Sequence, residues 1–239
     1  MVDTIARRQE RLVTRIHAVG RDDLELAGGK GANLGELMRA GFPVPDGFIV
    51  STEAYATVVE DARLAEVITA GLAARDDGAT IRAAFENVTI PDGLAAAIIA
   101  AYAADLGRGP VAVRSSATAE DLAGAAFAGQ QDTYLNVIGD AAVLDAVRRC
   151  WGSLWTERAI AYRRRQQIGS VNLRIAVVVQ LMVDAEFAGV MFTANPVTGT
   201  RDEVVVDATP GLGEAVVSGL VTPDHFVLDR LGEVREHTR

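Results

Sequence analysis

Residues 173–183 read LRIAVVVQLMV, a near-continuous run of β-branched and other apolar side chains. Such a run is typical of a strand that is buried on both of its faces. Two shorter segments follow, at 188–193 and 203–208, and we expect both to pair with it. Residues 196–199, PVTG, predict the turn between these two segments because they contain proline and glycine. The sequence therefore predicts a sheet built around residues 173–183, with a last strand at 225–229.

The first two thirds of the chain mix helical and strand patterns. Apolar spacing predicts strands at 13–19, 48–50, 111–113 and 133–137, and helices at 34–38, 52–74, 94–105 and 141–167. Gly41 is expected to end the first of these helices. The mixture predicts an α/β (α+β) fold. Because the composition changes near Gly169, we expect two domains, at 1–168 and 169–239.

Composition excludes several classes of protein. Hydrophobic residues make up 49% of the chain and charged residues 23%, as in ordinary globular domains. No apolar run approaches the length of a membrane span, and residues 1–15 lack an apolar signal core. A net charge of −9 argues against a nucleic-acid partner. We therefore expect a cytoplasmic protein with neither a membrane nor a nucleic-acid partner.

Two local features have ordinary structural interpretations. The run Arg163-Arg164-Arg165 is read as a solvated helix face, because isolated charge runs seldom form a binding site. The single cysteine, Cys150, falls at helical spacing with Val147, Trp151 and Leu154. It is expected to be a small buried apolar residue and not a nucleophile.

The glycine-rich segment at 28–31, GGKG, is the first candidate for a phosphate site. It matches neither the P-loop nor the dinucleotide fingerprint, since both need residues that are absent at the required spacing. Glycines still allow close approach of a ligand, and a following helix start favours an anion beside Lys30. On its own, however, the segment is explained better by a glycine turn with an exposed lysine.

Two later segments offer further candidates. Residues 113–121, VRSSATAED, place Arg114 at the end of a strand, before a loop rich in hydroxyl groups. Arginine can bind phosphate oxygens with two hydrogen bonds, and a small-residue loop can cover a triphosphate. The alternative is an ordinary surface loop. The strand around 177–183 suits an adenine ring, although a plain core strand explains it equally well.

Taken in order, these segments resemble the N-terminal ATP-binding domain of phosphoenolpyruvate synthase, pyruvate phosphate dikinase and rifampin phosphotransferase. The resemblance covers roughly residues 13–229. It is carried by GGKGANLGE at 28–36, FPVPDGF at 42–48, VRSSATAED at 113–121, FAGQQDTYLN at 127–136, GVMFTANP at 189–196 and GLGEAVVSG at 211–219. A series of motifs in this order is far more specific than any one of them.

The resemblance implies an ATP-grasp-like fold with ATP held between two lobes. It implies that Lys30 and Arg114 contact the phosphates and serve catalysis. It assigns Gly129 and Thr133 to the loop that covers the phosphates, Gln180 with the backbone of Met182 and Val183 to the adenine, and Glu214 to the ribose. Members of this family split ATP into AMP, and a histidine on a separate domain carries a phosphoryl group to the acceptor.

The sequence departs from the family pattern in two places. Ala126 stands where the family often has serine before the FAGQ segment. The family's Mg²⁺ ligands lie well after the GLGE segment, beyond Arg239, and no histidine here matches the phosphohistidine signature. We therefore expect ATP and Mg²⁺ as cofactors, no metal site within this C-terminally incomplete chain, and a separate chain or domain that carries the phosphohistidine and the acceptor site.

Two functions remain open. The chain is either the ATP-binding component of a dikinase-type phosphotransferase similar to phosphoenolpyruvate synthase, or a module that holds nucleotide without turning it over. Within the first class, residues 192–199, FTANPVTG, slightly favour the rifampin branch. In either case this chain alone is expected to be inactive in phosphoryl transfer.

Overall fold

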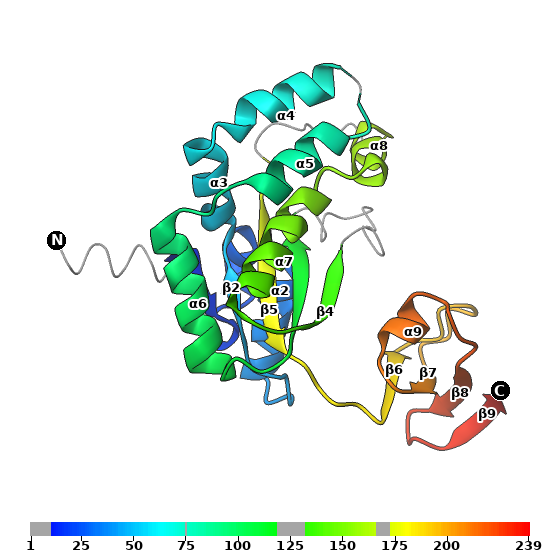
Figure 1. The fold of residues 1–239 in the computed structure, drawn as a ribbon. Coiled ribbons are helices and arrows are strands. Elements are labelled where there is room, and N and C mark those ends of the chain that lie inside the picture. Colours follow the sequence, from blue (N-terminus) through cyan, green and yellow to red (C-terminus); the bar gives the residue numbers. More distant parts are fainter. Residues whose placement is uncertain (1–10, 75, 119–131, 166–172) are drawn as a thin grey trace. The chain divides into compact units, whose positions relative to one another are not determined.

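The computed structural model describes residues 11–74, 76–118, 132–165 and 173–239. The chain forms two compact units, Met1–Met182 and Val183–Arg239. Each unit contains an antiparallel sheet, and helices accompany both sheets (Figure 1). The expectation of a mixed α/β chain is confirmed.

The first unit contains a five-stranded sheet in the order β1-β2-β5-β3-β4, in which every pair is antiparallel. Its strands are β1 (Val13–Arg15), β2 (Gly47–Val50), β3 (Val111–Ala117), β4 (Thr133–Val137) and β5 (Ile175–Leu181). Its helices are the 3₁₀ turns η1 (Ile16–Ala18) and η2 (Arg21–Asp23), α2 (Leu24–Arg39), α3 (Thr52–Asp61), α4 (Leu64–Ala73), α5 (Ala79–Asn87), α6 (Asp92–Leu106), α7 (Asp140–Ser153) and α8 (Glu157–Arg165). The strand expected at 173–183 is β5, which lies between β2 and β3 and whose side chains join apolar clusters on both faces of the sheet.

Two separate apolar layers cover this sheet. Alternate strand residues such as Phe48 and Val177 join the larger cluster with α3, α5, α6 and α7. The intervening residues, among them Ile49 and Val178, join a smaller cluster with Ala27 of α2. Figure 1 shows α6 and α7 on the near side of the sheet and α2 on the far side. The sheet face that contacts α2, here called the α2 face, thus has fewer apolar residues than the opposite face.

The second unit contains a four-stranded antiparallel sheet in the order β6-β7-β8-β9. Its elements are β6 (Phe187–Phe192), β7 (Glu203–Pro210), α9 (Glu214–Val217), β8 (Asp224–Asp229) and β9 (Val234–Thr238). The expectation that β6 and β7 pair with β5 is wrong, because they pair with each other. β9 was not expected from the sequence.

The division between the units also differs from the expected boundary at 168/169. That boundary falls within residues 166–172, which lie outside the described residues. The contacts divide the chain between Met182 and Val183. The reason is that β5 hydrogen-bonds to β2 and β3, so it belongs to the first unit with them.

Two helices differ from the sequence pattern, and the end of a third agrees with it. The helix expected at 52–74 is two helices, α3 and α4, because Arg63 adopts a left-handed conformation with φ 52°. The long helix expected at 141–167 is interrupted between α7 and α8. Gly41 follows α2 with φ 83°, and its amide donates to the Met38 carbonyl at 3.0 Å, as expected for the end of that helix.

The arginine run differs from its interpretation as a solvated helix face. Arg164 and Arg165 are exposed, but Arg163 is buried. Its Nη1 donates to the Leu154 carbonyl at 2.7 Å, and its guanidinium lies 5.2 Å from the centre of the Trp155 ring. Burial lowers the pKa of Arg163 to about 10. The side chain therefore ties α8 to the turn that precedes it.

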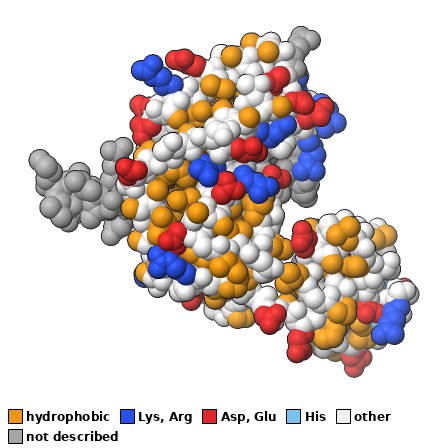
Figure 2. All heavy atoms as spheres, in the orientation of Figure 1, with side chains coloured by type: hydrophobic (Ala, Val, Ile, Leu, Met, Phe, Trp, Pro, Cys, Tyr) orange, Lys and Arg blue, Asp and Glu red, His pale blue; other side chains and the backbone are white. Residues whose placement is uncertain are grey.

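The surface charge in Figure 2 and the length of the described helices both bear on the expected partners of the chain. On the face that Figure 2 shows, basic and acidic side chains are interspersed. Within the described ranges, no single helix is long and apolar enough to cross a membrane. The pair α5–α6 meets the criteria of length and composition only when its two helices are taken together, and they are bent by 77° at the break.

We predict that Cys150 does not react with thiol reagents in the folded protein. Its side chain is fully buried, and this burial raises the pKa of the thiol well above its ordinary value. Since the thiolate is the reactive form, labelling at neutral pH should be roughly a hundredfold slower or more than in guanidinium. Absorbance of released thionitrobenzoate measures both rates, and comparable rates would contradict the burial of Cys150.

Candidate nucleotide site

The glycine-rich segment forms a sharp break inside α2. Gly28 has φ 67° and ψ 172°, whereas the residues on both sides of it are helical. This backbone conformation is essentially restricted to glycine. The break makes Gly28 the cap of a second helix segment, so that Gly29, Lys30 and Gly31 form its first turn. The expectation of a helix start beside Lys30 agrees with this geometry.

Ser116 of β3 lies against this break. Its hydroxyl donates to the Ala27 carbonyl at 2.9 Å and accepts from the Gly31 amide at 3.2 Å. Ser115, in contrast, donates from the opposite face of β3 to the Asp132 carbonyl at 3.3 Å. Because successive side chains of a strand point to opposite faces, the sequence alone could have assigned the two serines to different faces.

Arg114 lies on the same face of β3 as Ser116, two residues before it. It is directly opposite Thr133 of β4 on one side and Val178 of β5 on the other. Residues paired in this way project from one face of a sheet. Val178 belongs to the cluster with α2, so Arg114 and Thr133 are assigned to the α2 face. Two of the predicted phosphate contacts thus share a face with the helix that carries Lys30.

Arg114 is half-buried, and this burial lowers the pKa of its guanidinium. The guanidinium has therefore lost part of its hydration. Among the described residues, no hydrogen bond or ion pair to it is seen that would replace the lost water. An anion placed beside the guanidinium would restore that stabilisation. The electrostatics of this position suit a phosphate oxygen.

Gln180 lies on the α2 face as well, because β5 pairs it with Ala112 and Gly47. Its side chain is 6% exposed, and its Nε2 donates to the Pro45 carbonyl at 3.0 Å. Along β5, Gln180 lies four residues beyond the residue that pairs with Ser116, a distance of about 14 Å. This span is comparable with the length of an extended nucleoside triphosphate.

The other residues predicted to contact ATP are not assigned to the α2 face. The Met182 amide donates to the Pro110 carbonyl at 3.0 Å, so only the Met182 carbonyl is left for an adenine contact in this arrangement. Val183 and Glu214 belong to the second unit, where Glu214 is the exposed first residue of α9. Gly129 lies outside the described residues.

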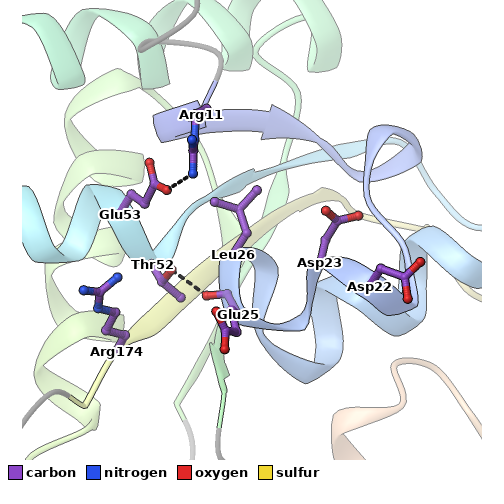
Figure 3. A pocket seen from close by; sticks show the side chains of 8 residues that line it. All are labelled: Arg11, Asp22, Asp23, Glu25, Leu26, Thr52, Glu53 and Arg174. Atoms are coloured by element: carbon purple, nitrogen blue, oxygen red, sulfur yellow. Dashed lines mark hydrogen bonds and ion pairs between the residues drawn. The ribbon is translucent and has the colours of Figure 1, made fainter.

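Two cavities in the first unit lie elsewhere. One, of about 280 Å³, adjoins the part of α2 before the break, and Figure 3 shows the side chains around it. There Arg11 bonds to Glu53, and the Thr52 hydroxyl donates to the Glu25 carbonyl at 2.7 Å. The other, of about 480 Å³, lies beside Trp155 and α4. Neither cavity is lined by a predicted site residue.

Comparisons with known proteins identify relatives of this chain. The family model described as "Pyruvate phosphate dikinase, AMP/ATP-binding domain" matches residues 24–238. Rifampicin phosphotransferase from Streptomyces sviceus is 50% identical over 96% of this chain and 27% of its own length. A probable phosphoenolpyruvate synthase from Methanothermobacter thermautotrophicus is 46% identical over 95% of the chain and 35% of its own length.

A third relative, phosphoenolpyruvate synthase from Aeropyrum pernix, is 44% identical over 93% of the chain and 29% of its own length. The chain thus spans between a quarter and about a third of these relatives. The family match itself covers most of this chain and includes both Lys30 and Arg114. The chain therefore belongs to the family of the pyruvate phosphate dikinase AMP/ATP-binding domain.

Proposed function

We propose that this chain binds ATP along the α2 face of its first sheet, as the ATP-binding component of a phosphotransferase similar to phosphoenolpyruvate synthase. The observation that carries the proposal is the pairing register. It aligns Thr133, Arg114 and Gln180 on the face that packs against the helix of Lys30. Family membership supplies the identity of the ligand.

The phosphates occupy the end of this face near Arg114. The guanidinium binds phosphate oxygens with two parallel hydrogen bonds, and Lys30 adds a mobile positive charge. Thr133 adds a hydroxyl at the start of β4, and Gly129 belongs to the loop that covers the phosphates.

The adenine occupies the other end, near Gln180. Gln180, the Met182 carbonyl and the Val183 backbone contact the base, and Glu214 contacts the ribose. We further propose an ATP-grasp-like fold for this chain. The strongest support for this part is the buried Gln180 amide, which already bonds to Pro45 and so holds a fixed orientation.

Mg²⁺ is the second proposed cofactor. Across the described ranges, no group of three or more His, Cys, Asp or Glu side chains is arranged to hold a metal ion. These residues therefore do not fit a metal site made by the protein alone. Lys30 and Arg114 remain the charge-neutralising groups that this chain itself offers to the phosphates.

In the complete reaction ATP is converted to AMP, and a histidine on a further domain or chain carries a phosphoryl group to the acceptor. Pyruvate is the acceptor in the first proposal. Rifampicin is the second candidate, favoured by the 50% identity to the Streptomyces enzyme and by residues 192–199. A nucleotide-binding module without turnover is the remaining alternative for this chain.

Calorimetric titration of the purified chain with ATP tests the proposal. We expect saturable binding of one ATP, with competition by inorganic triphosphate. Incubation with ATP and Mg²⁺, with and without pyruvate or rifampicin, then follows AMP release. Absence of saturable ATP binding by a folded chain would reject the proposed function. AMP formation that depends on an added acceptor would show that this chain is catalytically sufficient.

We predict that Gln180→Ala weakens ATP binding but leaves binding of inorganic triphosphate unchanged. Gln180 lies toward the end of the face away from Ser116, and triphosphate has no base for it to contact. Losing one neutral hydrogen bond should weaken ATP binding by roughly threefold to tenfold. Parallel titrations measure both ligands. Equal losses for both would mean that Gln180 supports the fold through Pro45.

A further inference from the structure

The helix segment that carries Lys30 has an unusual cap. A helix start usually receives its cap from the side chain of the N-cap residue, which accepts a hydrogen bond from an amide two or three positions later. Here the N-cap residue is Gly28, which has no side chain. The amide three positions later, Gly31, instead donates to the hydroxyl of Ser116, a residue 85 positions away in sequence.

Gly28 and Ser116 constrain each other sterically. A Cβ atom added to Gly28 would lie 2.1 Å from the Ser116 carbonyl oxygen and 2.4 Å from its hydroxyl oxygen. Real Cβ atoms do not approach other atoms so closely, so only glycine fits. Ser116 is fully buried, and its hydroxyl also donates to the Ala27 carbonyl. One side chain therefore bonds to the backbone on both sides of the break.

The same strand carries the candidate phosphate arginine. Arg114 and Ser116 are two residues apart on one face of β3, a rise of roughly 7 Å. We propose that Ser116 is a positioning residue for the ATP phosphates, a role that rests on the proposed function of Lys30 and Arg114. By capping the Lys30 turn from β3, Ser116 fixes the distance between the two positive charges that receive the triphosphate.

Loss of this hydroxyl releases the first turn of the segment. Lys30 then reaches the phosphates from a less defined position, whereas Arg114 keeps its own place in β3. The effect on binding passes through Lys30. It should appear for ligands with phosphates and should disappear when Lys30 is removed.

Titration of Ser116→Ala with ATP and with inorganic triphosphate tests this role in the full chain. Both affinities are expected to fall roughly fivefold to tenfold. Ser153→Ala is the matched control, because Ser153 is also buried and its hydroxyl donates to the Cys150 carbonyl at 2.7 Å in α7. Its ATP affinity should equal that of the unchanged chain. A similar loss in both variants would overturn the proposal in favour of general destabilisation.

A double-mutant cycle provides the readout that a purely structural role would not change. In a Lys30→Ala background, Ser116→Ala should cause no further loss of ATP affinity. The same additional loss in both backgrounds would overturn the proposal. If Ser116→Ala does not fold, Ser116→Cys keeps the size of the side chain with a weaker hydrogen-bonding group, and the cycle is measured with it.

The outcomes also separate this inference from the proposed function. If Lys30→Ala and Arg114→Ala both leave ATP affinity unchanged, the proposed function fails. If those variants weaken binding as expected but folded Ser116→Ala or Ser116→Cys binds ATP normally, only the positioning role of Ser116 fails.

Discussion

Replacing Lys30 or Arg114 with alanine is expected to weaken ATP binding by roughly tenfold to a hundredfold, because each change removes a hydrogen bond to a charged group. The loss should be large for Arg114→Ala. Its guanidinium is half-buried on the α2 face, where the electrostatic attraction to phosphate is screened less than at the surface. Calorimetric titration with ATP measures both affinities.

Arg108→Ala is a suitable control for the loss of a positive charge. Arg108 forms an exposed pair with Asp140 at 2.9 Å, in the same unit as Arg114. Exposed pairs contribute little, so this variant should retain both its stability and its ATP affinity. Unchanged ATP affinity in both Lys30→Ala and Arg114→Ala would contradict their assignment. An equal loss in Arg108→Ala would indicate an effect of net charge.

Gly28→Ala is expected to lower the free energy of unfolding by about 3 kcal/mol or more, since it combines a conformation restricted to glycine with a steric clash. The added methyl group would meet the backbone of Ser116, which cannot move without disturbing the pairing of β3 with β5. Guanidinium unfolding, followed by circular dichroism, measures the change. ATP affinity of any folded Gly28→Ala protein should fall as well.

Gly41→Ala is a control that has a positive φ but no steric clash. Gly41 also has a positive φ, of 83°, but a Cβ atom there would have no heavy atom within 4 Å. Only the conformational cost remains, about 1 kcal/mol. The difference between the two variants therefore reports the clash with Ser116 together with the more restricted backbone conformation of Gly28. Equal destabilisation would show that α2 and β3 are not in close contact at Gly28.

Local patterns predicted those features that depend on neighbours in sequence. The apolar run at 173–183 predicted a buried strand, and Thr133–Val137 was predicted with the bounds of β4. Proline and glycine after residue 40 predicted the end of α2. In each case the side chains that decide the structure lie within a few residues of one another.

Features that depend on distant residues were not predicted. A near-continuous apolar run marks β5 as buried but does not identify its neighbours, so β6 and β7 were assigned to it and β2 and β3 were not. Similarly, the glycine segment at 28–31 fails the spacing of the known phosphate loops, and its bond to Ser116, 85 residues away, is not visible in the local sequence. The family resemblance identified the candidate residues, but only the pairing register relates them on one face.

The position of β5 also constrains how the protein is made. Its strand neighbours β2 and β3 leave the ribosome long before it, and the sheet stays divided until residue 181 has been synthesised. Until then each neighbour has an open edge, which can pair with other chains. Contacts of such large sequence separation form slowly. Nascent or truncated chains that end before residue 181 should therefore depend on chaperones, whereas chains that include β5 should not.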